Sequence, residues 1–197
     1  MQRKFALGFL AAVACVGAQA SVVFQDDFES GLVDWSASSN YDGDTGIALR
    51  SDFVHGGANA LNTFLDHPLD AGAISNKYVR ASHEFTVTDA GDYLLELWAT
   101  NTSLGYEVLV DDLLVGTLQS SAVYEQVSHV LSGLSAGTHT LSLGLFVGTG
   151  TTGGLYTASF DDVSISSIGG GVVPEPQSLA LVLAALAATA ALRRRTV

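Results

Sequence analysis

The chain of 197 residues is predicted to be an all-β protein, a β-sandwich with one apolar segment at each end. Two observations predict the sandwich. Between the ends, short runs rich in Val, Leu, Thr, Tyr and Phe are separated by clusters of Gly, Asp, Asn and Ser, as strands are separated by turns. No amphipathic helix of credible length interrupts these runs, and ten or so short strands at this spacing are typical of two packed antiparallel sheets.

The strands are expected, in chain order, at Val22 to Phe28, Ile47 to Arg50, Ala60 to Phe64, Tyr78 to Val87, Tyr93 to Thr100, Tyr106 to Val110, Leu113 to Leu118, Val123 to Leu131, Thr138 to Val147 and Leu155 to Ile165. Two stretches, Tyr93 to Ala99 and Leu141 to Val147, show the period of two that is typical of a strand with one buried face. Asp111-Asp112 is expected to form a hairpin turn, and the Gly-rich stretch from 148 to 153 a hairpin loop.

The first twenty residues have the three parts of a secretory signal peptide. Arg3 and Lys4 form the basic start, an apolar run follows, and Ala18 and Ala20 form a small-x-small cleavage site for signal peptidase. Cys15 is the only cysteine, and the residues before it match a lipoprotein box in part but lack its leucine. Cleavage after Ala20 would leave a mature chain without a disulfide, a catalytic thiol or a thiolate metal site.

The C-terminal end also has three parts. Residues 169–177 form a Gly-rich linker with Pro174, Glu175 and Pro176, and residues 178–197 contain an apolar stretch followed by Arg193, Arg194 and Arg195. The stretch from Ser178 to Leu192 has no charge, Gly or Pro, so a helix of about 22 Å is predicted, shorter than the ~30 Å hydrocarbon core of a membrane. The arginines would hold its end in the cytoplasm.

This order of parts resembles the PEP-CTERM sorting signal of Gram-negative bacteria that make extracellular polysaccharide. The resemblance covers about the last 25 residues and implies that a membrane-embedded exosortase recognises the Pro174-Glu175-Pro176 tripeptide and removes the anchor. It implies transient attachment to the inner membrane, followed by delivery to the cell surface or extracellular matrix. The alternative is a simple C-terminal membrane anchor.

The segment between the two ends, residues 21–168, is long enough for one domain and is strongly acidic. Five of the eight Lys and Arg residues lie in the terminal segments, so Arg50, Lys77 and Arg80 face nineteen acids, a net charge of −16. Such a surface disfavours nucleic acid and anionic lipid, and is compatible with divalent cations and neutral sugars. Solubility in an extracellular medium explains the same charge without any ligand.

Five phrases narrow the sandwich to one architecture. The phrases are Phe24 to Gly31 followed by Trp35, Val54 to Leu61, Ala90 to Tyr93, Leu134 to Leu141, and Phe160 to Ile165. In this order they resemble the signatures of galactose-binding-like jelly rolls, the fold of many carbohydrate-binding modules. The resemblance spans nearly all of residues 21–168 and implies a jelly-roll β-sandwich in which the first and last strands pair. Trp35 is expected in its core.

The same resemblance implies a structural calcium ion. Asp27 and Glu29 near the first strand would approach Asp161 or Asp162 of the last strand, and backbone carbonyls from the turn at 54–59 would complete an oxygen cage. Calcium takes six to eight oxygen ligands, and clustered carboxylates repel each other without a cation. The alternative is that these acids are ordinary surface charges at strand ends.

Sugar binding requires flat aromatic platforms beside hydrogen-bonding groups. Trp98 is the first candidate because it shares a strand face with Glu96, opposite Tyr93, Leu95 and Leu97, and so is expected on an exposed sheet surface. Tyr106 and Tyr124 are further candidates. The alternative is that these aromatic side chains belong to the core.

Motifs that would indicate an enzyme are absent or misplaced. The G-x-G-x-x-G match at residues 148–153 lies between two strands with no helix after it, so the helix terminus that would hold a phosphate is missing. The five histidines show no H-E-x-x-H spacing. We therefore expect an exported, non-enzymatic surface protein that binds exopolysaccharide or matrix proteins. The alternatives are a purely structural or adhesive biofilm protein and a cryptic glycan hydrolase.

Overall fold

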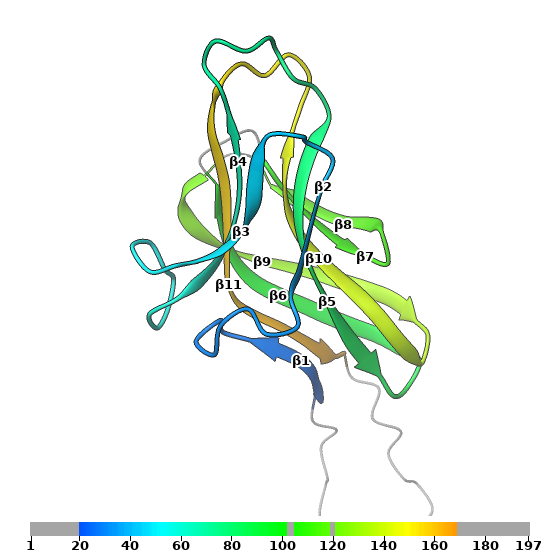
Figure 1. The fold of residues 1–197 in the computed structure, drawn as a ribbon. Helices are drawn as coiled ribbons and strands as arrows, with labels where there is room; N and C mark the ends of the chain where they lie inside the picture. Colours follow the sequence, from blue (N-terminus) through cyan, green and yellow to red (C-terminus); the bar gives the residue numbers. More distant parts are fainter. Residues whose placement is uncertain (1–19, 102–104, 119–120, 169–197) are drawn as a thin grey trace, which may run out of the picture. The chain divides into compact units, whose positions relative to one another are not determined.

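The computed structural model describes residues 20–101, 105–118 and 121–168, which belong to one compact unit (Figure 1). These residues contain eleven strands in two antiparallel sheets and no helix. The described part of the chain therefore offers no helix that is long and apolar enough to cross a membrane. The predicted signal peptide, linker, sorting signal and C-terminal helix fall on residues 1–19 and 169–197, outside the described residues.

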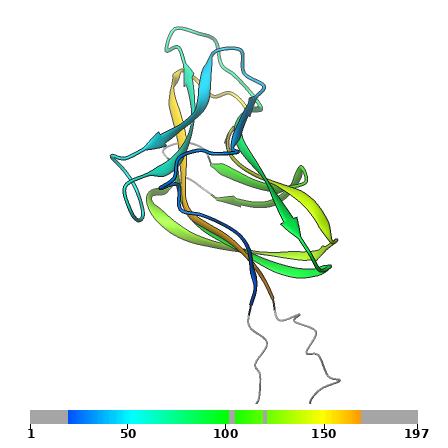
Figure 2. The same ribbon diagram turned by 60° about the horizontal axis from the view of Figure 1, so that its bottom comes forward.

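The six-stranded sheet has the order β3-β4-β11-β6-β9, and β1 pairs with the C-terminal half of β11, from Val163 to Ser166. Its strands are β1 (Val22–Asp26), β3 (Asp44–Arg50), β4 (Ala60–His67), β6 (Gly91–Asn101), β9 (Ser121–Leu134) and β11 (Gly154–Ser167). The first and last strands lie side by side, as Figures 1 and 2 both show and as the jelly-roll resemblance implied. This pairing brings the Asp26–Glu29 turn next to the middle of β11.

The five-stranded sheet has the order β2-β5-β10-β7-β8. Its strands are β2 (Ser36–Ser39), β5 (Lys77–Val87), β7 (Tyr106–Val110), β8 (Leu113–Leu118) and β10 (Gly137–Val147). The β7–β8 hairpin turns at Asp111 and Asp112, both with positive φ (50° and 63°), which matches the expected two-residue turn. The loop at 148–153 connects β10 to β11, but these strands belong to different sheets, so it crosses between the sheets and is not the predicted hairpin loop.

The core lies between the two sheets and follows the predicted alternation. Leu141, Leu143, Leu145 and Val147 of β10 are buried, and so are Tyr93, Leu95, Leu97 and Ala99 of β6. Trp35 is buried as expected, and its indole Nε1–H donates to Asp26 Oδ2 at 2.7 Å. Burial of these apolar faces is the main stabilising contribution in such a sandwich.

The structure differs from the sequence prediction in one additional strand, in the end of β1 and in the length of several strands, among them β3, which begins at Asp44, and β4, which ends at His67. It contains β2, a strand of four exposed residues with no apolar signal. It ends β1 at Asp26 instead of Phe28, because Phe28 adopts a positive φ of 59° and its N–H donates to Asp26 Oδ1. It extends β9 and β11 to 14 residues each.

Candidate functional site

The predicted acidic cluster converges on one turn of the loop between β3 and β4. Glu29 Oε1 accepts hydrogen bonds from the N–H groups of Ala58 and Asn59, both at 2.8 Å. Gly57 allows this approach, because its φ is +57° and a Cβ there would lie 2.4 Å from Glu29 Oε1. The carboxylate of Glu29 therefore holds this turn against the segment that follows β1.

Asp161 and Asp162 hold the other side of the same turn. Asp161 is fully buried, and its Oδ2 accepts the N–H groups of His55 and Gly56 at 2.9 and 3.0 Å. Its Oδ1 accepts the N–H of Asp162, and the Asp162 carboxylate lies 2.7 Å from His55 Nδ1. Burial is the largest effect on Asp161 and raises its pKa. The backbone N–H donors lower the pKa by less, and the neighbouring Asp162 carboxylate raises it slightly.

At the position of the predicted calcium site, two of the acids are bonded to backbone N–H groups. The groups of the 55–59 turn that face Glu29 and Asp161 are N–H donors, whereas a calcium cage would need carbonyl oxygens there. Asp27 accepts the N–H of Glu29 at 3.2 Å. Among the described residues, no three or more His, Cys, Asp or Glu side chains gather in a way that could hold a metal ion. Of the four acids that the sequence singled out, Glu29 and Asp161 therefore contact backbone amides of this turn and Asp162 contacts the His55 ring.

Trp98 lies on the outer face of the six-stranded sheet together with Glu96, as the alternation along β6 predicted. One face of the indole is covered by His55, whose ring is stacked at 3.7 Å between centroids and 12° between planes. Tyr124 also contacts His55, edge to face at 5.9 Å, and stacks on Phe53. Burial raises the pKa of Tyr124, and the nearby Asp161 carboxylate raises it further. The predicted aromatic and acidic side chains therefore both contact His55, which no sequence motif singles out.

Glu96 and Tyr106 have different surroundings. Glu96 accepts a hydrogen bond from the Ser128 hydroxyl at 3.4 Å on the same outer face. Tyr106 is 1% exposed and packs edge to face against Phe160 in the core, so its ring offers no platform to a sugar. The strand itself carries the signal that places it there, because Tyr106, Val108 and Val110 share one face of β7 and Glu107 lies on the other.

A second group of polar residues crosses the outer face of the five-stranded sheet. Arg80 on β5 donates from Nε to Glu107 Oε1 on β7 at 2.6 Å. The intervening strand β10 has Gly144 in register with both residues, so no side chain stands between them. The Arg80 guanidinium also lies over the Tyr78 ring, 4.1 Å from its centroid. Beside this pair, Phe146 is 38% exposed in register with Tyr78.

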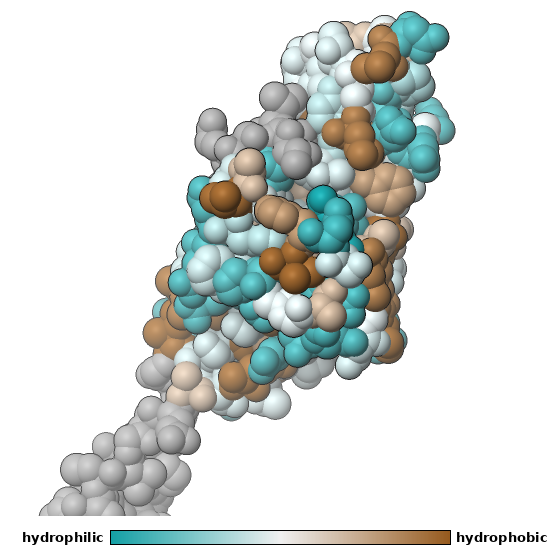
Figure 3. Space-filling model, turned by 90° about the vertical axis from the view of Figure 1, so that its left-hand side faces the viewer, coloured by the Kyte–Doolittle hydropathy of each residue, from teal (hydrophilic) through white to brown (hydrophobic). Residues whose placement is uncertain are grey.

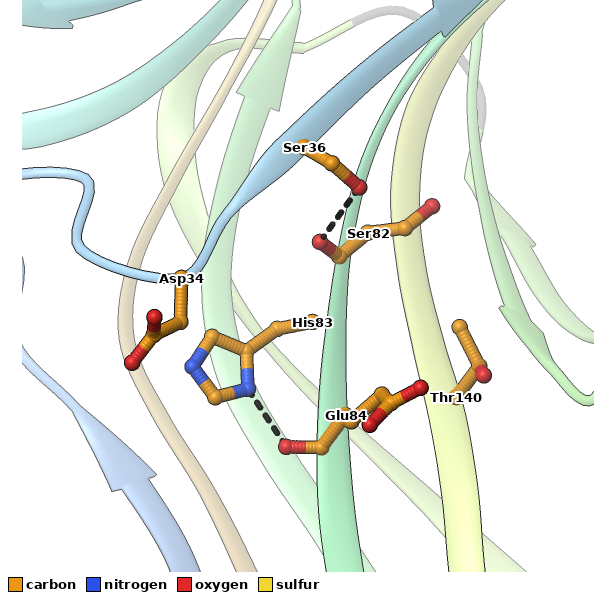
Figure 4. Close-up of a pocket in the computed structure, with 6 residues that line it drawn as sticks. All are labelled: Asp34, Ser36, Ser82, His83, Glu84 and Thr140. Atoms are coloured by element: carbon orange, nitrogen blue, oxygen red, sulfur yellow. Dashed lines mark hydrogen bonds between the residues drawn. The ribbon is translucent and has the colours of Figure 1, made fainter.

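The same face is hollowed next to this pair by a pocket of about 510 Å³, here called the β5 pocket (Figure 4). It is lined by Asp34, Ser36, Ser82, His83, Glu84 and Thr140. The serines are small and already bonded, Ser36 Oγ to the Ser82 carbonyl and Ser82 Oγ to Ser142 Oγ. In Figure 4, Asp34 lies on one side of His83, and Glu84 and Thr140 on the other.

The order of the strands creates this pocket. Asp34 has a positive φ of 64°, which turns the chain into β2, and Trp35 anchors that turn to β1 through Asp26. Ser36 then pairs with Ser82 of β5, and Glu84 pairs with Thr140 of β10. The pocket therefore combines three segments that are far apart in sequence, and no sequence motif marks it.

Comparisons with known proteins concern the fold. The sequence matches no protein-family model, and no curated protein sequence matches it. The structure is similar to the carbohydrate-binding module TmCBM61 solved in complex with β-1,4-galactotriose (TM-score 0.51, 16% identity, covering 72% of this chain and 94% of that one). It is also similar to the CBM22-1 xylan-binding domain of Paenibacillus barcinonensis Xyn10C (TM-score 0.53, 12% identity, covering 77% and 97%).

A third similar structure comes from an enzyme. It is the enzymatically active domain of bacteriophage CBA120 tailspike protein 4, with a TM-score of 0.52 and 10% identity, covering 72% of this chain and 20% of that one. At these identities the similarity shows a shared fold, the sandwich of carbohydrate-binding modules. Function has to be argued from the residues of this chain.

Proposed function

We propose that the protein binds a neutral polysaccharide without catalysis, and that the outer face of the five-stranded sheet is the binding surface. The observation that carries the proposal is the β5 pocket, whose volume of about 510 Å³ lies within the ~300–1,000 Å³ of ligand sites. Hydroxyl, carboxylate and imidazole groups line it, and these groups exchange hydrogen bonds with sugar hydroxyls. The shared fold with carbohydrate-binding modules supports the same ligand class.

The charge of the site favours a neutral sugar. Asp34 and Glu84 border the β5 pocket, and the domain as a whole carries far more acids than bases. A uronate or sulfated glycan would meet like charge there, which disfavours binding. Arg80 does not offset this, because its guanidinium already bonds to Glu107.

Affinity electrophoresis of the full-length chain in detergent, through gels containing xylan, β-1,4-galactan or mannan, tests the proposal. We expect retardation by at least one glycan, and about tenfold weaker binding for Glu84→Ala or Thr140→Val, since each removes one hydrogen-bonding group. Thr86→Val is the matched control, because Thr86 is exposed on the same face of β5 but does not line the pocket. Unchanged retardation of both pocket variants would overturn the proposed surface.

We further propose that the chain reaches the cell surface or extracellular matrix as a substrate of signal peptidase and an exosortase-type protease. The basis is the order of Ala18 and Ala20, the Pro174-Glu175-Pro176 tripeptide, the apolar stretch and Arg193 to Arg195. The ligand there would be exopolysaccharide. Intact mass of the protein from envelope and medium tests this. A species from Ser21 to about Pro176 is expected, and a species that retains the three arginines would overturn exosortase processing.

A further inference from the structure

The outer face of the six-stranded sheet contains a second hollow, of about 430 Å³, here called the β4 groove. It is lined by Leu49, Arg50, Asp52, Asn62, Phe64, Leu155 and Thr157. These residues come from β3, the loop after it, β4 and β11, three strands that are neighbours in the sheet. The groove lies on the opposite sheet from the β5 pocket and shares no residue with it.

Phe64 supplies a flat apolar group to this groove. Gly46 of β3 pairs with Phe64 of β4, and a Cβ on Gly46 would lie 3.2 Å from the Phe64 ring, so the glycine leaves room for the ring beside the β3 backbone. Leu155, 60% exposed, and Leu49, 41% exposed, flank it. Apolar side chains of this kind contact the C–H faces of a sugar ring and lose water on binding.

Polar groups surround this apolar floor. Asn62 Oδ1 accepts the Ser159 hydroxyl at 3.0 Å, which leaves its Nδ2 group to donate to a ligand. Arg50 donates to both carboxylate oxygens of Asp52, at 2.7 and 3.2 Å, so its positive charge is paired. Thr157, which is buried, lines the groove on the central strand β11.

The groove continues along the sheet. Arg50 and Thr157 also line an adjoining hollow of about 180 Å³, together with Phe53, Thr100, Ala122 and Ser159. Thr100 lies on β6 and Ala122 on β9, so the two hollows follow each other across β4, β11, β6 and β9. The side from which the β3–β4 loop projects shows apolar side chains in small separate patches among hydrophilic ones (Figure 3). An alternation of apolar and polar groups suits an extended neutral saccharide better than an apolar protein surface.

From these observations we infer that the β4 groove is a second saccharide-binding site, with Phe64 as its platform and Asn62 and Arg50 as its hydrogen-bonding groups. The ligand class, a neutral glycan, rests on the proposed function, but the site does not. Because the β4 groove and the β5 pocket lie on the two outer faces of the sandwich, one domain can hold two glycan chains and join them. The inferred activity is cross-linking of polysaccharide.

A bridging assay tests this inference. Full-length protein in detergent is bound to insoluble xylan, washed, and offered fluorescein-labelled xylohexaose; galactan with galactotriose and mannan with mannohexaose are tested in parallel. We expect the captured protein to retain the soluble oligosaccharide. Phe64→Ala and Asn62→Asp should lower the retained label about tenfold while binding to the insoluble glycan persists. Val130→Ala, an exposed apolar residue on β9 outside the groove, is the control.

The outcomes separate this inference from the proposed function. Binding with bridging that both groove variants abolish supports the second site. Bridging that persists in the groove variants overturns it and leaves the proposed function intact. Binding that only the groove variants abolish supports the groove and overturns the β5 pocket as a site. If no glycan binds at all, both are overturned.

Discussion

Arg80 and Glu107 are joined across an intervening strand. Arg80 Nε on β5 lies 2.6 Å from Glu107 Oε1 on β7, and β10 passes between them with Gly144 in register with both. Glu107 is buried and Arg80 is largely covered, so each charge depends on the other to offset the cost of desolvation. The glycine is the local feature that permits the pair.

Gly144→Ala should therefore destabilise the domain. A Cβ at this position would lie 2.7 Å from the Val79 carbonyl oxygen and 2.9 Å from Arg80 Cγ, so backbone and side chain must both shift. We expect a loss of about 1–3 kcal/mol in the free energy of unfolding, measured by urea denaturation. Gly148→Ala is the matched control, because a Cβ there meets nothing within 4 Å. Equal stability of the two variants would contradict a steric role for Gly144.

Asp161 is expected to be more sensitive to truncation than the exposed acids around it. Its carboxylate accepts three backbone N–H groups and ties β11 to the β3–β4 loop, so Asp161→Ala leaves these donors unpaired. We expect a loss of about 3 kcal/mol, and a smaller one for Asp161→Asn, whose amide oxygen can still accept. Asp52→Ala, in the exposed part of the same loop, should change stability little. Thermal unfolding of the three variants measures this order.

The predicted calcium ion has a specific consequence here. Glu29 Oε1 and Asp161 Oδ2 are bonded to backbone N–H groups, so an ion would have to displace these bonds or use the remaining carboxylate oxygens, including those of Asp27 and Asp162. If calcium binds as the sequence resemblance implies, millimolar Ca²⁺ raises the melting temperature of the wild type but not of Glu29→Gln. A melting temperature that is the same in Ca²⁺ and in EGTA would show that amide contacts alone hold this turn.

The sequence predicted the strands well because nearly every strand has one buried apolar face. It missed β2 because Ser36 to Ser39 are all exposed, and this strand exists through pairing with β5 and the Trp35 anchor beside it. It placed Trp98 on the outer sheet face, since the alternation along β6 is visible in the sequence, whereas the ligand roles of Trp98 and of the acids stay predictions. It could not find the Arg80–Glu107 pair or the β5 pocket, because strand order alone brings these residues together. Tyr106 shows the converse error: its residue type suggested a platform, whereas its position on β7 placed it in the core.

The stack of His55 on Trp98 should couple the β3–β4 loop to β6. The rings lie nearly parallel at 3.7 Å, and His55 is also held by Asp162. A double-mutant cycle of His55→Ala and Trp98→Ala should give a coupling free energy of about 1 kcal/mol, typical of stacked rings. Purely additive losses would mean that the contact contributes nothing beyond burial. Sugar binding that survives Trp98→Ala would overturn the prediction that Trp98 is a platform.

His139 should make stability depend on pH. Its Nδ1 lies 2.6 Å from Asp111 Oδ2 and its Nε2 2.9 Å from the Ser135 carbonyl oxygen, so both ring nitrogens face acceptors and the protonated ring satisfies both. The hydrogen bond to Asp111 and then that to Ser135 raise the pKa of His139. Burial opposes the lowering of the Asp111 pKa, but the hydrogen bonds from His139 and the Thr140 N–H outweigh it.

The direction of the effect follows from these shifts. A raised histidine pKa gives stability that is complete below the unfolded-state pKa of about 6.5 and is lost as pH rises through the folded-state value. The lowered Asp111 pKa gives stability that is complete above about 3.9 and is lost at lower pH. The pair therefore contributes most between about pH 4 and 6.5.

The measurement must compare the wild type with a variant, because His129 also titrates. Burial lowers the pKa of His129, so its contribution to stability increases with pH, opposite to that of His139. His139→Asn keeps one donor without the charge, and the stability difference between wild type and this variant should shrink from pH 5.5 to pH 8.5, about one unit below and two units above the ordinary histidine pKa. A difference that does not vary with pH would show that the His139 ring is neutral in the folded protein.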